Sequence, residues 1–364
     1  MRDEERGMRN EGRTVCLIPR PSSLIPTKGV TATKWMIGIV SALLLAAWGR
    51  SESSGSRHQV TEPEEWTLPR EGASGLDLRT QGGNIRVVGA AVDQLQVRAV
   101  KKARGDSDAD VRAFLELMRV ERRRDGDRWV VEASWPEPRP RRIEEANVSF
   151  EIQVPHGMRL EAGSRGGNVE VSGVGETRLH TGGGNIQARD IGGALDVHTG
   201  GGNLQVDACT GPIDLETGGG NIEIHQAQRA VKAHTGGGNI QVEGRAGPVD
   251  AHTGGGNIEL RQAESPVKAI TGAGNVQVEI ARASGAAQVE LGTGAGNVDL
   301  RLPQDISARV EANSNLGHVQ IEPAAGAQYN RGHGHLQAVL GDGQGTVRLR
   351  TGVGGIRIRL TATP

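Results

Sequence analysis

The sequence predicts an all-β fold, a single-chain parallel β-solenoid with about 18 residues and two short strands in each coil. Three observations lead to this prediction: a five-residue phrase that recurs, a finer apolar period within each repeat, and a shortage of large side chains. Of the 364 residues 55 are Gly, and aromatic residues make up only 2%. This composition is unusual for an ordinary globular core, so another kind of packing must stabilise the chain.

The recurring phrase is Thr-Gly-Gly-Gly-Asn, and a variant carries Ala in its third position. The phrase begins at Thr181, Thr199, Thr217, Thr235 and Thr253, at a constant interval, and the variant begins at Thr271 and Thr293. An apolar residue also recurs twice in each interval, at Ile186, Leu195, Leu204, Ile213, Ile222, Val231, Ile240, Val249, Ile258, Val267 and Val276. A second apolar residue follows each of these two positions later. This spacing predicts short strands with one buried face, joined by glycine turns.

Parallel stacking explains the repetition best, because identical coils then bury identical residues in continuous columns. Hairpin strands in an antiparallel meander are the alternative. The handedness of parallel crossovers favours a right-handed coil. The same apolar pairs occur from Leu76 to Leu360, so we expect the solenoid to span residues 76–360, after a linker at residues 51–75.

One segment, residues 100–147, departs from the pattern. Its stretch Asp108 to Val120 has helical spacing, and Asp125-Gly126 lies between two strand-like runs, which predicts a helix and a hairpin. The segment carries Phe114, Trp129 and Trp135. We expect this small α/β insertion to cover the first coils as a cap, because an exposed terminal strand templates aggregation.

The first 50 residues have the features of an export signal. Met36 to Trp48 form a short apolar stretch, preceded by Lys28 and Lys34. This stretch is too short for a comfortable membrane-spanning helix and is typical of a signal peptide. We therefore expect an exported protein, in the periplasm, on the outer surface or outside the cell. Contact with the membrane is expected only if the segment is not cleaved.

Charge and composition exclude several partners. The formal net charge is −1, with both signs spread along the chain, and the repeats have no aromatic residues on which bases could stack. Nucleic acid is therefore not an expected partner. The regular coils lack the long loops that build a groove with paired carboxylates, so we predict no catalytic residues, no enzyme activity and no cofactor.

The asparagines of the repeats form one candidate column. They are predicted to make a structural ladder, in which stacked side-chain amides hydrogen-bond from coil to coil: Asn185, Asn203, Asn221, Asn239, Asn257, Asn275 and Asn297. The threonine hydroxyls are expected to face inward and cap the turns. A calcium-binding β-roll, which has a coil of the same length, needs Asp in its turns, and these turns offer Asn alone.

A second candidate column faces outward. His180, His198, His234 and His252 occupy the same position of their repeats, with Glu216 between the two pairs. Neighbours on adjacent coils would lie about 5 Å apart, close enough for two imidazoles to share a metal ion or to respond to acidification. A solvated polar face explains them equally well. The column beside them is expected to be an alternating charged surface that keeps the protein soluble, and it consists of Asp196, Asp214, Lys232, Asp250 and Lys268.

The strand FEIQVP, which ends at Val154-Pro155, is followed by the R-G-G-N and T-G-G-G-N units. This arrangement resembles the bacterial putative-adhesin family of domains of unknown function, over most of residues 60–360. The resemblance implies a β-strand-repeat protein of the cell envelope. We therefore expect a non-catalytic scaffold that binds an unidentified protein or glycan. A self-assembling structural element of the envelope is the alternative, and a polysaccharide-active enzyme is a third candidate.

Overall fold

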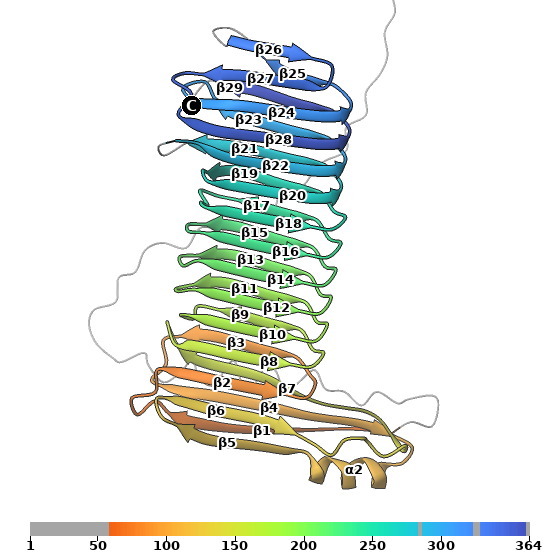
Figure 1. The fold of residues 1–364 in the computed structure, drawn as a ribbon. Helices are drawn as coiled ribbons and strands as arrows, with labels where there is room; N and C mark the ends of the chain where they lie inside the picture. Colours follow the sequence, from red (N-terminus) through yellow and green to blue (C-terminus); the bar gives the residue numbers. More distant parts are fainter. Residues whose placement is uncertain (1–57, 283–285, 323–327, 362–364) are drawn as a thin grey trace, which may run out of the picture. The chain divides into compact units, whose positions relative to one another are not determined.

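The computed structural model describes residues 58–282, 286–322 and 328–361, and for residues 328–332 it describes the backbone alone. The predicted export segment, residues 1–50, lies outside these residues. The described residues belong to one of the two compact units into which the chain divides, Gly55–Pro364. They form two long β-sheets whose apolar faces pack against each other, and a short helix (Figure 1). The prediction of an all-β fold with long parallel sheets is confirmed.

Sheet A has 14 strands in the described part of the chain. In spatial order these are β1 (His58–Pro69), β4 (Gln94–Gly105), β7 (Ile143–Pro155), β3 (Ile85–Ala90), β9 (Val169–Ser172), β11 (Ile186–Ile191), β13 (Leu204–Cys209), β15 (Ile222–Ala227), β17 (Ile240–Glu243), β19 (Ile258–Glu264), β21 (Val276–Arg282), β23 (Val298–Pro303), β29 (Ile356–Thr361) and β25 (Val319–Glu322).

Sheet B has 15 strands within the same described ranges. In spatial order these are β26 (Gln328–Gly332), β27 (His335–Leu340), β24 (Ala308–Leu316), β28 (Gly345–Val353), β22 (Gln288–Ala295), β20 (Val267–Ala273), β18 (Val249–Thr253), β16 (Val231–Thr235), β14 (Ile213–Thr217), β12 (Leu195–Thr199), β10 (Thr177–Thr181), β8 (Arg159–Ser164), β2 (Gly75–Thr80), β6 (Arg128–Ser134) and β5 (Arg119–Asp125).

The central strands pair in parallel, and each residue lies beside the one 18 positions further along the chain. Leu195 pairs with Ile213 in sheet B, and Ile186 pairs with Leu204 in sheet A. Residues at both positions are buried in each central coil, while the residues that alternate with them along each strand face outward. Val, Ile, Leu and Ala fill the space between the sheets of these central coils, so no aromatic ring is needed there. Side-chain alternation with period two is what fixes this register.

The turns that follow the sheet B strands are held together by buried hydroxyls. Thr217 Oγ1 donates to the carbonyl oxygen of Gly202 on the preceding coil, 2.8 Å away, and accepts from the backbone N–H of Gly220 at 3.3 Å. The same pair of bonds recurs at Thr199, Thr235 and Thr253. The threonines therefore face inward, as expected from their position in the strand.

Close stacking explains two of the three glycines in each phrase. A Cβ on Gly218 would lie 2.1 Å from the carbonyl oxygen of Gly200, and one on Gly220 would lie 2.0 Å from that of Gly202. A Cβ on the middle residue, Gly219, would meet nothing within 4 Å. The register partners at this middle position include Ala273 and Ala295, so larger side chains occur where the structure leaves space.

The N-terminal end differs from the expected coil order. The strands β2 and β3 do not form the outermost coil: β2 lies between β6 and β8, and β3 lies between β7 and β9 (Figure 1). Beyond them β4 pairs antiparallel with β7, and β1 pairs antiparallel with β4. The periodic pattern shows which side chains face inward but does not distinguish between similar neighbouring coils, so it could not give this order.

The prediction of a linker at residues 51–75 is wrong for His58–Pro69, which form the strand β1. All twelve residues of β1 pair with β4, from His58 opposite Gly105 to Pro69 opposite Gln94. The apolar alternation of this edge strand is interrupted: Trp66 and Leu68 pack toward the core, but Glu62 and Glu64 occupy the equivalent positions before them. Its glutamates form ion pairs across the pair of strands. Glu64 lies 2.5 Å from Lys101.

The helix α2 (Asp108–Leu117) and the hairpin of β5 and β6 lie within the predicted insertion. The helix begins at Ser107, whose Oγ accepts from the backbone N–H of Asp110, which is a common N-cap. The Ser107 hydroxyl also donates to the carboxylate of Asp110, and this hydrogen bond lowers the pKa of Asp110. The helix packs on β1, β4 and β7 and buries Phe114 in the core.

At the C-terminal end, too, the spatial order of the coils differs from their order in the sequence. The last two strands, β28 and β29, lie between the β22–β23 coil and the β24–β25 coil (Figure 1). The hairpin of β26 and β27 then pairs antiparallel with β24. Both ends of the described chain are therefore tied into the sheets by segments that are not neighbours in sequence. No helix among the described residues has the length and apolar character needed to cross a membrane.

Candidate binding surface on the outer face of sheet B

Parallel pairing turns the outward side chains of sheet B into two columns. The histidine column consists, in spatial order, of Arg79, Gly163, His180, His198, Glu216, His234, His252 and Ile270. The charged column runs beside it and consists of Asp77, Glu161, Arg178, Asp196, Asp214, Lys232, Asp250 and Lys268. The structure thus brings all four histidines singled out in the sequence into one column.

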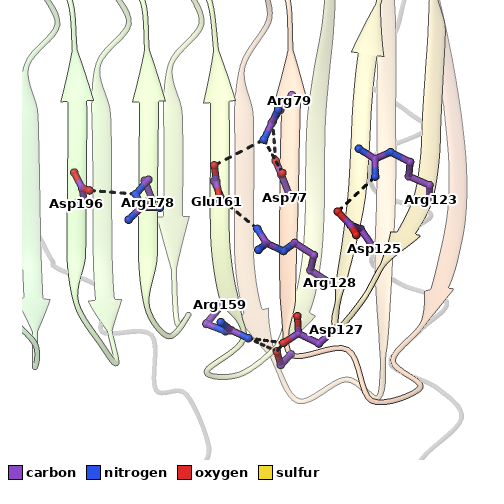
Figure 2. Close-up of polar contacts among 11 residues, drawn as sticks. Asp77, Arg79, Arg123, Asp125, Asp127, Arg128, Arg159, Glu161, Arg178 and Asp196 are labelled. Atoms are coloured by element: carbon purple, nitrogen blue, oxygen red, sulfur yellow. Dashed lines mark hydrogen bonds and ion pairs between the residues drawn. The ribbon is translucent and has the colours of Figure 1, made fainter.

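Opposite charges meet along the charged column. Arg178 Nε lies 3.1 Å from Asp196 Oδ2, and Arg128 reaches Glu161 at 3.6 Å (Figure 2). The hydrogen bond to Asp196 raises the pKa of Arg178. The guanidinium groups are exposed, so these pairs contribute little to stability.

The glycine in the histidine column leaves a hollow on this face. Gly163 lies between Arg79 and His180, and the space above it is a depression of about 570 Å³ that Glu161 and Arg178 also line. Arg79 Nη2 lies 2.8 Å from Asp77 Oδ2 and 3.9 Å from Glu161, which places its guanidinium at the rim (Figure 2). This hydrogen bond to Asp77 raises the pKa of Arg79. Cations and carboxylates around a hollow can bind the hydroxyl and carboxylate groups of a ligand.

A second depression adjoins the first along β8, β10, β12 and β14. It has a volume of about 430 Å³ and is lined by Arg159, Glu176 and Asp214 among others. Arg159 pairs with Asp127 at 2.5 Å, and Asp127 also accepts from the hydroxyl of Ser74 (Figure 2). The hydrogen bond from Ser74 lowers the pKa of Asp127. The charged groups on this part of the face are therefore oriented by their neighbours.

The histidines differ in their contacts. His198 has a carboxylate at each ring nitrogen, with Asp196 Oδ1 3.2 Å from Nδ1 and Glu216 Oε2 2.9 Å from Nε2. His252 lies beside His234, with ring centroids 5.2 Å apart, and its Nε2 is 2.7 Å from Asp250 Oδ1. The ligand atoms of His234, Asp250 and His252 all lie within 4.8 Å of one another.

The seven predicted asparagines lie at one edge of the fold, and their ladder uses different atoms from those expected. The side-chain Oδ1 of Asn185 accepts from the backbone N–H of Asn203 at 2.8 Å, and this bond repeats up to Asn297, which accepts from the backbone N–H of Gly355. The expected bond between side-chain amides is therefore replaced by a bond from side chain to backbone. The ladder also includes Asn84 and Asn168.

Sequence reasoning missed two features of this face. The repeat pattern groups Asp250 with the charged surface and not with the histidines, although it lies two residues before His252 on the same side of the strand. The hollow is hidden in the sequence because Arg79 precedes the long insertion, and its pairing with Gly163 follows only from the observed order of β2 and β8. Extending the repeat register backwards across the insertion would have found it.

The fold and this face define an all-β repeat protein that presents regular columns of charged and polar side chains. A model of the Toastrack DUF4097 family matches residues 73–359, and the chain belongs to this family of unknown function. The resemblance seen in the sequence is thereby confirmed. A comparison with the curated proteins finds no match.

Several solved structures are similar to this chain, among them the following three. A putative cell adhesion protein from Clostridium sporogenes is 14% identical, with a TM-score of 0.25, and the match covers 83% of this chain and 100% of that one. A putative adhesin from Bacteroides fragilis is 12% identical, with a TM-score of 0.29 and coverage of 82% and 97%. A putative adhesin from Parabacteroides distasonis is 8% identical, with a TM-score of 0.30 and the same coverage, 82% and 97%. At these TM-scores the likeness carries no conclusion about function.

Proposed function

We propose that this chain is an exported, non-catalytic scaffold, adhesin-like in its role, that binds a protein or glycan at the cell envelope through the outer face of sheet B. In this proposal each coil is one repeat long and has two strands, the coils are right-handed, and residues 100–147 act as a cap. The observation that carries the proposal is the hollow over Gly163, with Arg79, Arg178 and Glu161 held around it.

The charge pattern favours a ligand with both hydroxyl and anionic groups. Guanidinium groups on two strands, at Arg79 and Arg178, line the same hollow as the carboxylate of Glu161. Acidic glycans and protein surfaces with mixed charge offer the complementary groups. The backbone beneath is fixed by the buried columns, so binding requires little ordering of the site.

The ends of the sheets favour a separate scaffold over a self-assembling element. An assembly that grows by stacking needs open, complementary terminal strands. Among the described strands, the N-terminal edges are β1, which contains Pro63 and Pro69, and β5, whose sequence RVERRRD is strongly charged. Proline and repeated charge are features that prevent pairing between edges.

The test uses a substitution that fills the hollow without disturbing the coil. A Cβ on Gly163 would have only the carbonyl oxygen of His180 nearby, at 3.9 Å, so Gly163→Arg adds bulk and charge at an open position. Gly237→Arg is the matched control, because its Cβ meets nothing within 4 Å and it lies at the turn after β16, which does not line the hollow. The purified full chain is screened by biolayer interferometry against immobilised neutral glycans, acidic glycans and envelope proteins.

The proposal predicts that one ligand class binds, that G163R weakens this binding at least about tenfold, and that G237R leaves it unchanged. Binding that G163R does not alter would place the site elsewhere. Cell fractionation tests the location, and a chain that stays in the cytoplasmic fraction contradicts export. Growth of the sedimentation coefficient with concentration would favour the self-assembling element instead.

A further inference from the structure

We propose that His234, His252 and Asp250 form a binding site for a divalent transition metal ion, with Zn²⁺ as the representative case. The ligand atoms of the three residues lie within 4.8 Å of one another. His234 and His252 are register partners on β16 and β18, and their rings meet edge to face at an interplanar angle of 89°. Asp250 lies on the same face as His252, two residues earlier on the same strand.

The backbone of both strands is fixed independently of any metal. The residues that precede the two histidines, Ala233 and Ala251, are fully buried, and those that follow them, Thr235 and Thr253, make the buried turn hydrogen bonds. Ligands around a tetrahedral Zn²⁺ are about 3.3 Å apart, given metal–ligand bonds near 2.0–2.1 Å. Rotation of the half-exposed side chains closes the remaining distance, so the ion can bind without rearranging the fold.

Metal binding requires ring nitrogens that are not already engaged, and His234 and His252 offer them. His252 Nε2 contacts Asp250 Oδ1 at 2.7 Å. Within the described part of the chain, Nδ1 of His252 and both nitrogens of His234 make no hydrogen bond or ion pair. Asp250 can therefore coordinate the ion itself or orient the ring of His252 from its second nitrogen. Imidazole ligands favour Zn²⁺, Ni²⁺ and Cu²⁺ over Mg²⁺ and Ca²⁺, which prefer oxygen.

The chain contains its own comparison three repeats earlier. His180 and His198 are register partners on β10 and β12, in the same column and at the same depth in the strand. Here, however, both nitrogens of His198 face carboxylates, Asp196 at 3.2 Å and Glu216 at 2.9 Å. Among the described residues, three ligand atoms come within 4.8 Å of one another only at His234, Asp250 and His252, and we expect the pair of His180 and His198 not to bind.

Neighbouring charges limit the affinity of the site for metal ions and make it selective for ions that prefer nitrogen ligands. Asp250 has Lys232 and Lys268 beside it in the charged column, and Lys232 also lies 3.8 Å from Asp214. These ammonium groups oppose a dication, so the imidazoles must supply most of the binding. A metal that binds mainly to oxygen gains little at this site.

The site is tested by isothermal titration calorimetry of the metal-free full chain with ZnCl₂ at about pH 7.5, where free histidines are neutral. Wild type is expected to bind one ion, His252→Gln to lose this binding, and His234→Gln and Asp250→Asn to bind at least about tenfold more weakly. His180→Gln and His198→Gln are the matched controls and are expected to bind like wild type. Circular dichroism confirms that each variant is folded.

A second readout uses Co²⁺ in place of Zn²⁺. Coordination by two imidazoles and a carboxylate gives Co²⁺ visible absorption bands that free aqueous Co²⁺ lacks, and the double variant H234Q/H252Q should not show them. The proposal is overturned if wild type binds neither ion, if H234Q/H252Q binds both as wild type does, or if H180Q/H198Q loses the binding. The last result would place the metal at the other histidine pair.

Discussion

The backbone N–H of Asn239 donates to the side-chain Oδ1 of Asn221, 2.8 Å away on the preceding coil. Both residues are exposed, so this ladder stabilises the turn edge without contributing to the core. Asn221 in turn donates its own N–H to Asn203. Each asparagine therefore links its coil to both neighbours, once through its backbone and once through its side chain.

The ladder predicts a difference between two small substitutions. Asn221→Ala removes the acceptor for Asn239 and should lower the free energy of unfolding by about 1 kcal/mol, since water can partly replace the bond at an exposed edge. Asn221→Asp keeps an oxygen at the same position and should lose less. Urea denaturation followed by circular dichroism measures both. Equal losses would show that the side-chain oxygen is not what matters.

The turn threonines should be far more sensitive. Thr217→Val keeps the shape but leaves the Gly202 carbonyl and the Gly220 N–H without their partner, at a cost of about 1–3 kcal/mol for each buried group. Thr217→Ser keeps the hydroxyl and loses one buried methyl group, which costs about 1 kcal/mol. We expect T217V to unfold at a clearly lower urea concentration than T217S. The reverse order would contradict the hydrogen-bond role.

Adjacent glycines of one phrase should respond in opposite ways to alanine. Gly219→Ala enters open space and should be neutral or stabilise slightly, by up to about 1 kcal/mol. Gly220→Ala would place its Cβ 2.0 Å from the Gly202 carbonyl oxygen and should cost more than about 3 kcal/mol or prevent folding. Thermal melting of the two variants checks this. Similar melting temperatures would rule out such close stacking of the turns.

Stability should also depend on pH through His225 on sheet A. Its Nε2 lies 2.8 Å from Glu223, and Glu243 on the next strand is 3.4 Å from Nδ1. The pKa of His225 is raised, and the hydrogen bond to Glu223 is the main cause. Asp207 on the preceding strand also contributes to this shift. An unfolded histidine titrates near pH 6.5. The stabilisation is therefore complete below about pH 6.5 and is lost as the pH rises through the higher folded pKa.

The measurement is the urea midpoint of wild type and His225→Gln between about pH 5.5 and pH 8.5. Wild type should lose stability relative to H225Q as the pH rises across this range. A constant difference between the two proteins would show that His225 does not titrate with a raised pKa. Glu223→Gln should reduce the pH dependence without removing the histidine.

The central coils could be predicted from sequence because the constant spacing of the repeats determines the register of their strands. Residues such as Ile213 and Leu215 recur at fixed intervals, and period two then decides which face is buried. The positions of Thr217 and of the histidines follow from the same parity. An inward or outward position does not reveal which atoms form hydrogen bonds. The hydrogen bond between the side chain of Asn221 and the backbone of the next coil was therefore not predicted.

The ends could not be predicted in the same way. The buried residues of β28, Val347 and Leu349, resemble those of every other coil, so nothing local indicates that β28 lies between β22 and β24. The strand β1 has Pro63 among its glutamates and shows apolar alternation only near its end, at Trp66 and Leu68, and its strand character comes from pairing with β4. Long-range pairing decides both cases, and a single sequence does not show it.

The most direct test of the fold concerns the register in which each residue lies beside the one 18 positions later. Gln205 and Glu223 are such partners on the outer face of sheet A, and Cα atoms of paired parallel strands are close enough for a disulfide. We would replace Cys16 and Cys209 by Ala, introduce Gln205→Cys with Glu223→Cys, and quantify the disulfide by mass spectrometry after mild oxidation. The control combines Gln205→Cys with Ile224→Cys, whose side chains face opposite sides of the sheet. Efficient bonding of the first pair and little of the second is the predicted result; the opposite preference, or no bond in either, would contradict the fold on which the binding surface and the metal site depend.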